Sequence, residues 1–148
     1  MIFIASDHGG WKLKAIIVDW LKQKKLKVRD LGPKILQQGD DYPDFAFPLA
    51  KQVAKAKKDL GILICRNGVG MSIAANKVKG IKAGLCSFIG QTITARAHDN
   101  CNILVLPADF ITEEKAIKII DTFLQAKFSG EERHIKRLGK IEEYEKGK

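Results

Sequence analysis

The stretch GILICRNGVGMSIAANK, residues 61–77, decides the fold. It begins with an apolar run that ends at Cys65, continues through a loop with Gly68 and Gly70, and leads into an alanine-rich segment, 71–77. This order indicates a β-strand, a tight glycine loop and an α-helix, with a thiol at the carboxyl end of the strand. A buried strand-end cysteine without chemistry has the same pattern, so the pattern alone leaves both interpretations open.

The loop after this strand has the composition of an anion site. In an open α/β sheet, ligands bind beyond the carboxyl ends of the strands. The backbone amides of residues 66–70, in front of a helix N-terminus, would form a concavity for an anion. A thiol beside such amides predicts a base or nucleophile next to an oxyanion hole.

Composition predicts one α/β domain over residues 1–148. The chain is 45% hydrophobic and 29% charged, as in an ordinary globular protein. Its apolar runs fall short of the roughly 20 residues of a membrane span, and MIFIASDHGG at the start is typical of a first strand rather than a signal peptide. Three cysteines without metal-ligand spacing favour a reducing cytosol, so we expect a cytoplasmic protein without a membrane partner.

The net charge of +9 is compatible with nucleic acid, an acidic surface or an anionic substrate as partner. The lysines are scattered over amphipathic stretches, without the interleaved aromatic residues that a single-strand binder uses. A solvated basic face is therefore favoured over nucleic-acid binding.

Hydrophobic periodicity predicts five strands that alternate with helices. The expected strands are 2–5, 26–31, 61–65, 81–86 and 102–106, and the expected helices are 11–24, 45–57 (capped by Asp44), 71–77, 90–97, 113–126 and 131–146. This alternation implies right-handed βαβ units and a five-stranded parallel sheet with helices on both faces. Polar groups next to the strands would gather at one rim of the sheet: Asp7, His8, Cys65, Cys86, Pro107 and His98.

Several motifs together resemble the type B ribose-5-phosphate isomerases, whose superfamily includes allose-6-phosphate and galactose-6-phosphate isomerases. They are DHGG at 7–10, DYPD at 41–44, GILIC at 61–65, GMSIAANK at 70–77, the segment at His98, and RHIKR at 133–137. The resemblance covers nearly the whole chain in register. It implies a Rossmann-like αβα domain without metal or organic cofactor, and homodimers, which can pair into tetramers, with each active site built from both subunits.

The resemblance also implies the reaction, which is the interconversion of ribose 5-phosphate and ribulose 5-phosphate through an enediolate. Cys65 would be the proton-shuttling base, because the chain has Met71 where another subclass carries a carboxylate. A nearby helix N-terminus would lower the pKa of the thiol. The backbone amides of residues 67–70 would hold the enediolate.

The remaining roles follow from the same resemblance. His98 would assist ring opening with Asp7 of the partner subunit, and His8 and Tyr42 would line the sugar site. Arg133, His134 and Arg137 would hold the phosphate, with the two arginines on one helix face. Without the resemblance, His98 is typical of a helix-end histidine and the basic cluster of a solvated face.

Four departures from the family pattern fall in the expected site. Arg66 stands for a glycine, Asn67 for a hydroxyl residue, Asp99 for an asparagine and Asp109 for a phosphate-binding arginine, and in addition Gly90 replaces an aromatic residue. Loss of one phosphate arginine costs about 1.5–3 kcal/mol, the scale of a charged hydrogen bond. Three hypotheses remain open: Arg66 partly replaces the lost arginine, the enzyme isomerises another sugar or sugar phosphate, or the chain is an impaired subunit or binding protein that retains the fold.

Overall fold

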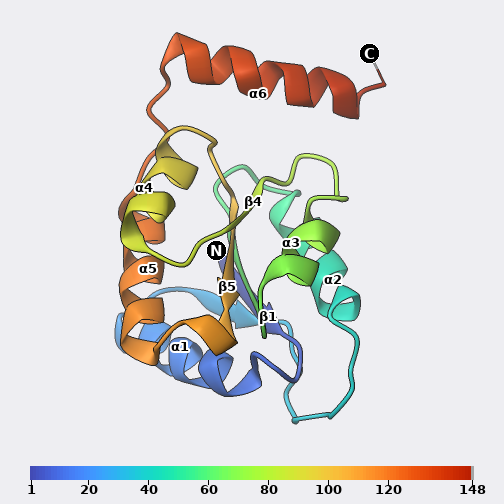
Figure 1. Ribbon diagram of the computed structural model, residues 1–148, viewed down its shortest axis with the longest axis vertical. Coiled ribbons are helices and arrows are strands. Elements are labelled where there is room, and N and C mark those ends of the chain that lie inside the picture. Colours follow the sequence, from blue (N-terminus) through green and yellow to red (C-terminus); the bar gives the residue numbers. More distant parts are fainter. Residues whose placement is uncertain (148) are drawn as a thin grey trace.

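The computed structural model describes residues 1–147, and these residues form an α/β structure around one sheet (Figure 1). The strands are β1 (Ile2–Ser6), β2 (Val28–Asp30), β3 (Leu60–Cys65), β4 (Ala83–Leu85) and β5 (Ile103–Pro107). The helices are α1 (Trp11–Gln23), α2 (Pro43–Val53), α3 (Val69–Ala75), α4 (Ile89–Ala97), α5 (Glu113–Gln125) and α6 (Glu132–Glu145), with a short 3-10 helix, η1, at Ala108–Phe110.

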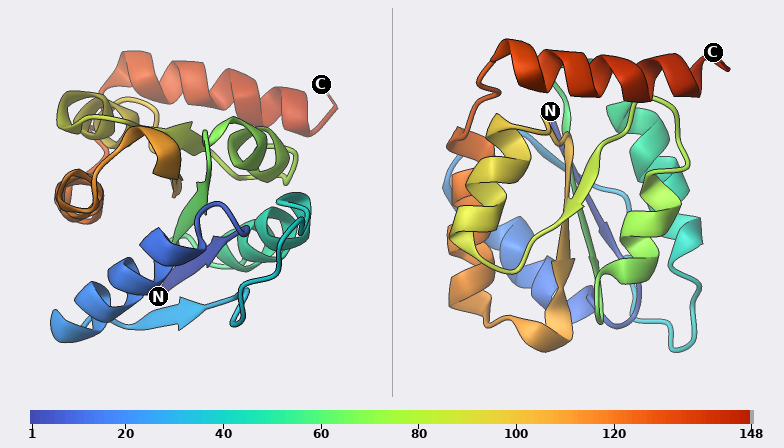
Figure 2. Two further views of the ribbon diagram at one scale, coloured as in Figure 1. Left: turned by 60° about the horizontal axis from the view of Figure 1, so that its bottom comes forward. Right: turned by 45° about the horizontal axis from the view of Figure 1, so that its top comes forward.

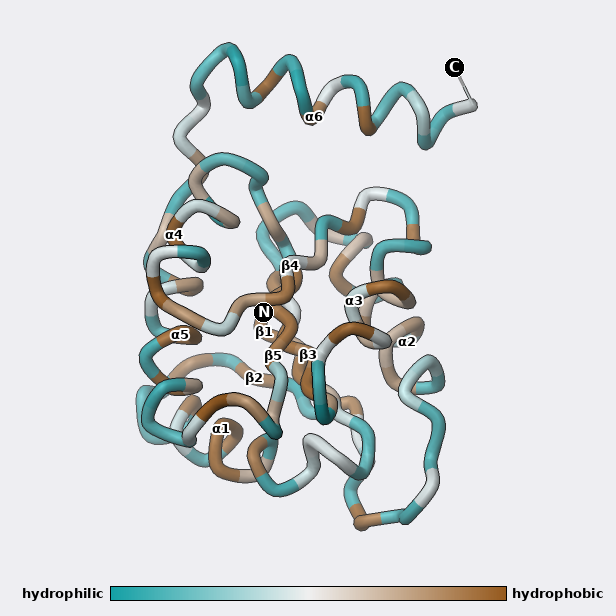
Figure 3. The backbone as a smooth tube through the Cα atoms, in the orientation of Figure 1, coloured by the Kyte–Doolittle hydropathy of each residue, from teal (hydrophilic) through white to brown (hydrophobic). Residues whose placement is uncertain are grey.

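All strand pairs are parallel, in the order β2-β1-β3-β5-β4. Side chains alternate between the two faces of the sheet, since successive residues of a strand point to opposite sides. Ile62 and Ile64 pack on the face covered by α1, α4 and α5, whereas Leu63 and Cys65 pack on the face covered by α2 and α3. Figure 3 shows the resulting concentration of apolar residues along the central strands. The predicted fold class is confirmed.

The element boundaries differ from expectation mainly around α2 and α3. Asp44 is not the cap of α2, because the helix begins at Pro43, whose fixed φ suits a first helical position, and Asp44 lies in the first turn. The loop after β3 is shorter than predicted, since Gly68 is the residue before the helix and α3 begins at Val69. Strands β2 and β4 each keep only three residues.

Two ends of the structure are important for the site. Helix α6 crosses the sheet at the amino ends of the strands (Figure 2), where the Glu145 carboxylate accepts hydrogen bonds from the Gly80 amide at 3.0 and 3.2 Å. The loop between β2 and α2 lies at the opposite, carboxyl edge. Lys14 anchors the start of this loop by donating to both Asp30 carboxylate oxygens and to the Pro33 carbonyl.

Within residues 1–147, every helix is too short or too polar to cross a membrane.

Candidate active site

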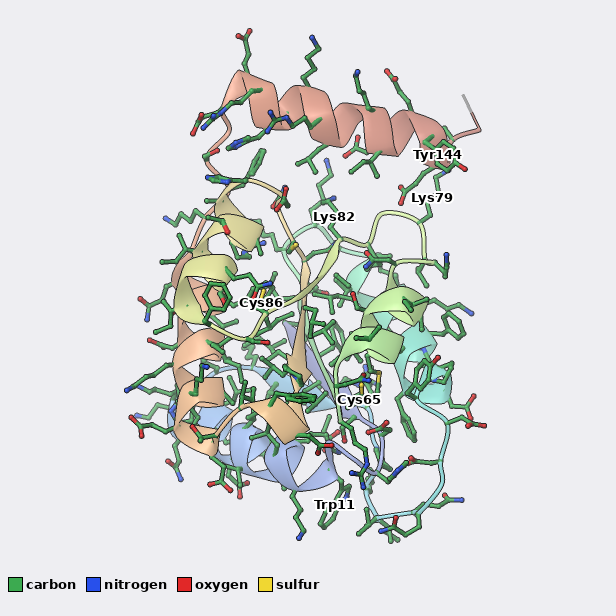
Figure 4. The ribbon with its side chains drawn as sticks, in the orientation of Figure 1. Trp11, Cys65, Lys79, Lys82, Cys86 and Tyr144 are labelled. Carbon is green, nitrogen blue, oxygen red and sulfur yellow. The ribbon has the colours of Figure 1, made fainter. Side chains whose placement is uncertain are left out.

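Cys65 ends β3 with its thiol facing the loop that follows, and Figure 4 shows it at the carboxyl edge of the sheet. The Gly68 amide donates to Cys65 Sγ at 3.1 Å. This close turn requires Gly68 to adopt a φ of 77°, which glycine tolerates without strain. The predicted strand, glycine loop and thiol therefore have the expected arrangement.

The electrostatics of the thiol differ from expectation. Burial raises the pKa of Cys65, whose exposed fraction is 5%. The amides of Met71 and Gly68 act to lower the pKa of the thiol, but their effect is smaller than that of desolvation, and the negative charge of Asp7 raises it further. The lowered pKa expected from the helix N-terminus is therefore wrong for the single chain.

Asn67 is exposed, and its side chain stabilises the loop. Its Oδ1 accepts a hydrogen bond from the Val69 amide at 3.0 Å, at the start of α3. Two of the four amides predicted to hold an enediolate, those of Gly68 and Val69, thus already have partners within the loop.

Asp7 and His8 follow β1, which lies beside β3 in the sheet. Asp7 is 7% exposed and accepts a hydrogen bond from the Gly10 amide at 3.1 Å. Burial raises the pKa of the Asp7 carboxyl, although the Gly10 amide acts in the opposite direction. Asp7 and Cys65 are therefore neighbouring acids, both shifted toward their neutral forms.

Tyr42 approaches the same loop from the start of α2. A Cβ atom at Gly70 would lie 2.7 Å from the Tyr42 Cζ atom, so the ring packs directly on the Gly70 backbone. Only glycine permits this approach in the first turn of α3. The structure thus brings Tyr42, Gly68 and Gly70 together beside Cys65.

Arg66 and Asp109 connect the ends of β3 and β5. Arg66 Nη1 lies 3.3 Å from Asp109 Oδ2, and the Asp109 amide donates to the Arg66 carbonyl at 2.9 Å. Both residues line a cleft of about 250 Å³ with His8 and Lys12. The Asp109 carboxylate, at the position where the resemblance leads us to expect an arginine, therefore lines the expected ligand region, with Arg66 as its counter-ion.

The other predicted site residues lie at the amino edge. His98 follows α4, which runs antiparallel to the strands, and its ring contacts that of His134 of α6, with centroids 4.4 Å apart and the ring planes tilted by 40°. His134 is 3% exposed, and its Nδ1 lies 3.0 Å from Ser129 Oγ. The expectation that His98 joins the carboxyl rim within one chain is wrong, because a residue that precedes a parallel strand lies at its amino end.

The predicted residues thus form two groups. The carboxyl-edge group contains Asp7, His8, Tyr42, Cys65, Arg66, Asn67, Gly68 and Gly70, and the amino-edge group contains His98, Asp99, Arg133, His134 and Arg137. Arg133, Arg137 and Asp99 are exposed, and Arg133 Nε donates to Glu131 at 2.8 Å. Lys82 and Tyr144 mark the amino edge in Figure 4, opposite Cys65.

Asp40 is the residue near the site that sequence reasoning missed. It precedes the DYPD motif and bonds His8 through two hydrogen bonds. Its sequence neighbours gave no signal of this contact, since residues 8 and 40 meet only through the tertiary fold. Among residues 1–147, we find no cluster of three or more His, Cys, Asp or Glu side chains arranged to hold a metal ion.

Comparison with known proteins places this geometry in a family. A family model described as ribose/galactose isomerase matches residues 2–141. The probable ribose-5-phosphate isomerase B of Mycoplasma genitalium is 53% identical, with 98% of this chain and 95% of that protein covered. A D-erythrulose-4-phosphate isomerase of Pectobacterium atrosepticum is 37% identical, with 98% and 97% covered.

Solved structures agree with the sequence comparison. The crystal structure of Mycoplasma genitalium ribose-5-phosphate isomerase B with bound ribulose-5-phosphate superposes with a TM-score of 0.95 at 52% identity, over 99% of this chain and 97% of that one. The Clostridium thermocellum ribose-5-phosphate isomerase B gives a TM-score of 0.94 at 44% identity, with the same coverage. The family model, the sequence identities and the superposed structures agree, so the chain belongs to the ribose/galactose isomerase family.

Proposed function

We propose that this chain is an aldose–ketose isomerase that interconverts ribose 5-phosphate and ribulose 5-phosphate, a reaction of the pentose phosphate pathway. The observation that carries the proposal is the Cys65 thiol at the end of β3, 3.1 Å from a loop amide and next to Asp7. The relatives named ribose-5-phosphate isomerase B support the choice of substrate. The three cysteines are free thiols, which agrees with a reducing cytoplasm.

The proposed chemistry is a proton transfer between neighbouring carbons. The Cys65 thiolate removes the proton from C2 of open-chain ribose 5-phosphate, and the electron pair forms the C1–C2 double bond while the C1 carbonyl oxygen becomes an oxyanion. The thiol then returns the proton to C1, and a proton moves from the oxygen on C2 to the oxygen on C1. This leaves a carbonyl at C2, which is ribulose 5-phosphate.

The loop residues would support the oxyanion rather than exchange protons by ionising. Backbone amides that are fixed before the reaction stabilise a developing negative charge without reorganisation. Asn67 cannot ionise, so the proton transfer between the substrate oxygens is expected to run through neighbouring groups or water, with the Asn67 amide as a hydrogen-bonding partner only.

A complete site would need a second copy of the chain. His98, Arg133, His134 and Arg137 lie at the amino edge, whereas Cys65 lies at the carboxyl edge, so one chain does not bring the ring-opening and phosphate groups to the thiol. We therefore include a homodimer with shared active sites in the proposal, and pairing of dimers into tetramers remains compatible with it.

The surface around the edge strand β4 supports this assembly. A groove of about 520 Å³ is lined by residues of β4, α4 and α6. Strand β4 lies between α3 and α4 (Figure 1). Helices α3 and α4, with the residue before α4, expose five large apolar side chains, which is unusual on a free surface: Val69, Ile73, Phe88, Ile89 and Ile93. A second copy would cover both these side chains and the unpaired strand edge.

The direct test follows ribulose 5-phosphate formation from ribose 5-phosphate. Wild type is expected to turn over, and Cys65→Ala is expected to lose about 100- to 10,000-fold in kcat, the usual contribution of a general base. Cys86→Ala is the matched control, because Cys86 is also a buried free thiol but lies on the other face of the sheet. A folded wild type without turnover would overturn the substrate assignment, and equal loss in both variants would overturn the role of Cys65.

A different phosphorylated sugar is the second candidate substrate. The Arg66–Asp109 pair changes the charge of the cleft relative to the family pattern, and one relative is named as an isomerase of a four-carbon sugar phosphate. Comparison of kcat/KM for four-, five- and six-carbon aldose phosphates decides between the candidates, since the preferred chain length gives the highest value.

A further inference from the structure

Asp40 contacts His8 through two hydrogen bonds. One oxygen of its carboxylate, Oδ1, accepts hydrogen bonds from the His8 backbone amide at 2.8 Å and from the ring nitrogen Nδ1 at 2.7 Å. Since a carboxylate only accepts, Nδ1 carries the proton in this contact. The other ring nitrogen, Nε2, is therefore the one left for a ligand.

The burial of Asp40 makes this contact electrostatically significant. Its side chain is 7% exposed, and among the described residues its second oxygen, Oδ2, is buried without a hydrogen-bond partner. A buried carboxylate with an unpaired oxygen is costly unless a positive charge lies close to it. The His8 ring, which is 24% exposed, is the group placed to supply that charge.

The charges around His8 come from three elements. Asp40 approaches from the β2–α2 loop, Asp7 from the same turn as His8, and Arg66 from the loop after β3. The hydrogen bond to Asp40 is the largest influence and raises the pKa of His8, Asp7 adds to it, and burial and Arg66 act in the opposite direction. Lys12 and Asp109 line the same cleft as His8.

We propose that Asp40 is a positioning residue that fixes His8 with Nε2–H toward the cleft as a cation for the phosphorylated sugar. The ligand chemistry rests on the proposed function. Gly39 has a φ of 76°, and this turn brings the following carboxylate back onto the β1–α1 turn. Asp40 thus connects the β2–α2 loop with His8. The same loop contributes Leu36 and Gln38 to the cleft.

The variant Asp40→Asn separates charge from shape. An asparagine oxygen can still accept both hydrogen bonds from His8, but it carries no charge to stabilise the imidazolium. The chain has three histidines, so NMR titration of their ring protons, assigned with His8→Asn, follows His8 directly. We expect its titration midpoint in Asp40→Asn to fall by about one pH unit or more, the usual effect of losing a close opposite charge.

Kinetics then test whether the cation is used. KM for ribose 5-phosphate is expected to rise as pH increases through the His8 midpoint, and in Asp40→Asn this rise begins at lower pH. The ratio of the two KM values grows between the two midpoints, and above both of them KM of the variant exceeds that of wild type by about tenfold for each unit of separation. The second ionisation of the substrate phosphate is common to both proteins and does not alter the comparison.

Asp44→Asn is the matched control, because it removes an exposed carboxylate near the same loop and should leave the His8 midpoint unchanged. An unchanged midpoint in Asp40→Asn overturns the proposal, and so does a lowered midpoint without a shift of the KM profile. If wild type lacks isomerase activity, the proposed function fails, while the NMR titration still decides whether Asp40 sets the charge of His8.

Discussion

Arg66 Nη1 lies 3.3 Å from Asp109 Oδ2, and the backbones of the same two residues are joined by a 2.9 Å hydrogen bond from the Asp109 amide to the Arg66 carbonyl. The backbone contact follows from the parallel register, in which Cys65 lies beside Pro107. The cation and the anion that we expect to depart from the family pattern therefore form a pair at adjacent strand ends. Each partly neutralises the charge that the other brings to the cleft.

The first prediction concerns this pair. Asp109→Arg removes a carboxylate that repels phosphate and supplies a guanidinium, so KM for ribose 5-phosphate is expected to fall by about 10- to 100-fold, the scale of one charged hydrogen bond. Arg66→Gly alone leaves Asp109 without its counter-ion and should raise KM. Both side chains are well exposed, so stability should change by less than about 1 kcal/mol. Steady-state kinetics and urea denaturation measure both effects, and an unchanged KM in Asp109→Arg would show that Asp109 does not influence phosphate binding.

The second prediction is the pH dependence of catalysis. Because burial raises the pKa of Cys65 above its ordinary value, only a minor fraction of the free enzyme carries the thiolate near neutral pH. If the thiolate is the base, kcat at saturating ribose 5-phosphate should rise by roughly tenfold per pH unit below the pKa of the thiol. The rate of alkylation by iodoacetamide, measured in a Cys86→Ala background, should follow the same curve. A kcat profile that is flat above about pH 6, or an alkylation rate that is flat over the same range, would contradict a thiolate with a raised pKa.

The sequence was sufficient for the fold because the deciding signals are local. The apolar run 62–64, the glycine loop and the Thr112 cap, whose hydroxyl accepts from the Lys115 amide, each specify structure within a few residues. The start of α3 could not be predicted from such local signals. Glycine is typical of a loop, but Gly70 lies inside α3, and the Tyr42 ring, from a distant element, packs against its backbone.

The electrostatics of the site could not be predicted for the same reason. A helix N-terminus lowers a thiol pKa, and this signal is visible in the sequence, but the desolvation that outweighs it depends on the packing of β3 against α2 and α3. The contact of Asp40 with His8 joins residues 32 positions apart. His98 lies at the amino edge because α4, which it follows, runs antiparallel to the strands.

The third prediction tests sharing of the active site between subunits. If Cys65 of one chain acts with His98 of its partner, an inactive Cys65→Ala protein and an inactive His98→Asn protein should form a heterodimer with one intact site. When equal amounts of the two variants exchange subunits at random, about half of the dimers are heterodimers, each with one intact site of two, so about a quarter of wild-type activity is restored. Cys65→Ala mixed with Asp7→Asn is the control, since Asp7 and Cys65 lie at the same edge of one chain and should not complement each other. Complementation by the control pair, or its absence in the test pair, would contradict the shared site.

The fourth prediction concerns the groove along β4. Replacing Ile93 with lysine places a charge among exposed apolar side chains, and burying it in an interface would be costly. The variant is expected to sediment as a monomer at concentrations where wild type is a dimer, and to lose isomerase activity while retaining its far-UV circular dichroism. Leu26→Lys is the control, because Leu26 is also exposed but lies before β2 at the opposite edge of the sheet. A monomeric wild type would refute the interface, as would a dimeric Ile93→Lys protein.

The fifth prediction concerns stability at alkaline pH. Burial raises the pKa of Cys101 to about 12, far above the ordinary value of 9.0. Above pH 9, the unfolded chain releases this proton while the folded chain keeps it, so the folded state binds more protons and the free energy of unfolding falls as pH rises. Between about pH 8 and pH 10, this single group should remove about 1 kcal/mol.

The effect of Cys101 is isolated by comparison with Cys101→Ala. Urea denaturation at both pH values gives the free energy of unfolding of each protein, and the loss on raising pH should be smaller in the variant by about 1 kcal/mol. The comparison is independent of any overall destabilisation by the substitution, because it uses the change with pH within each protein. Cys101 lies in the packed region with Ala95 and Cys86, and its thiol is 3.0 Å from where a Cβ atom of Gly84 would lie, so water has little access to a thiolate there. Equal pH dependence in the two proteins would show that Cys101 ionises as readily in the folded chain as in the unfolded one.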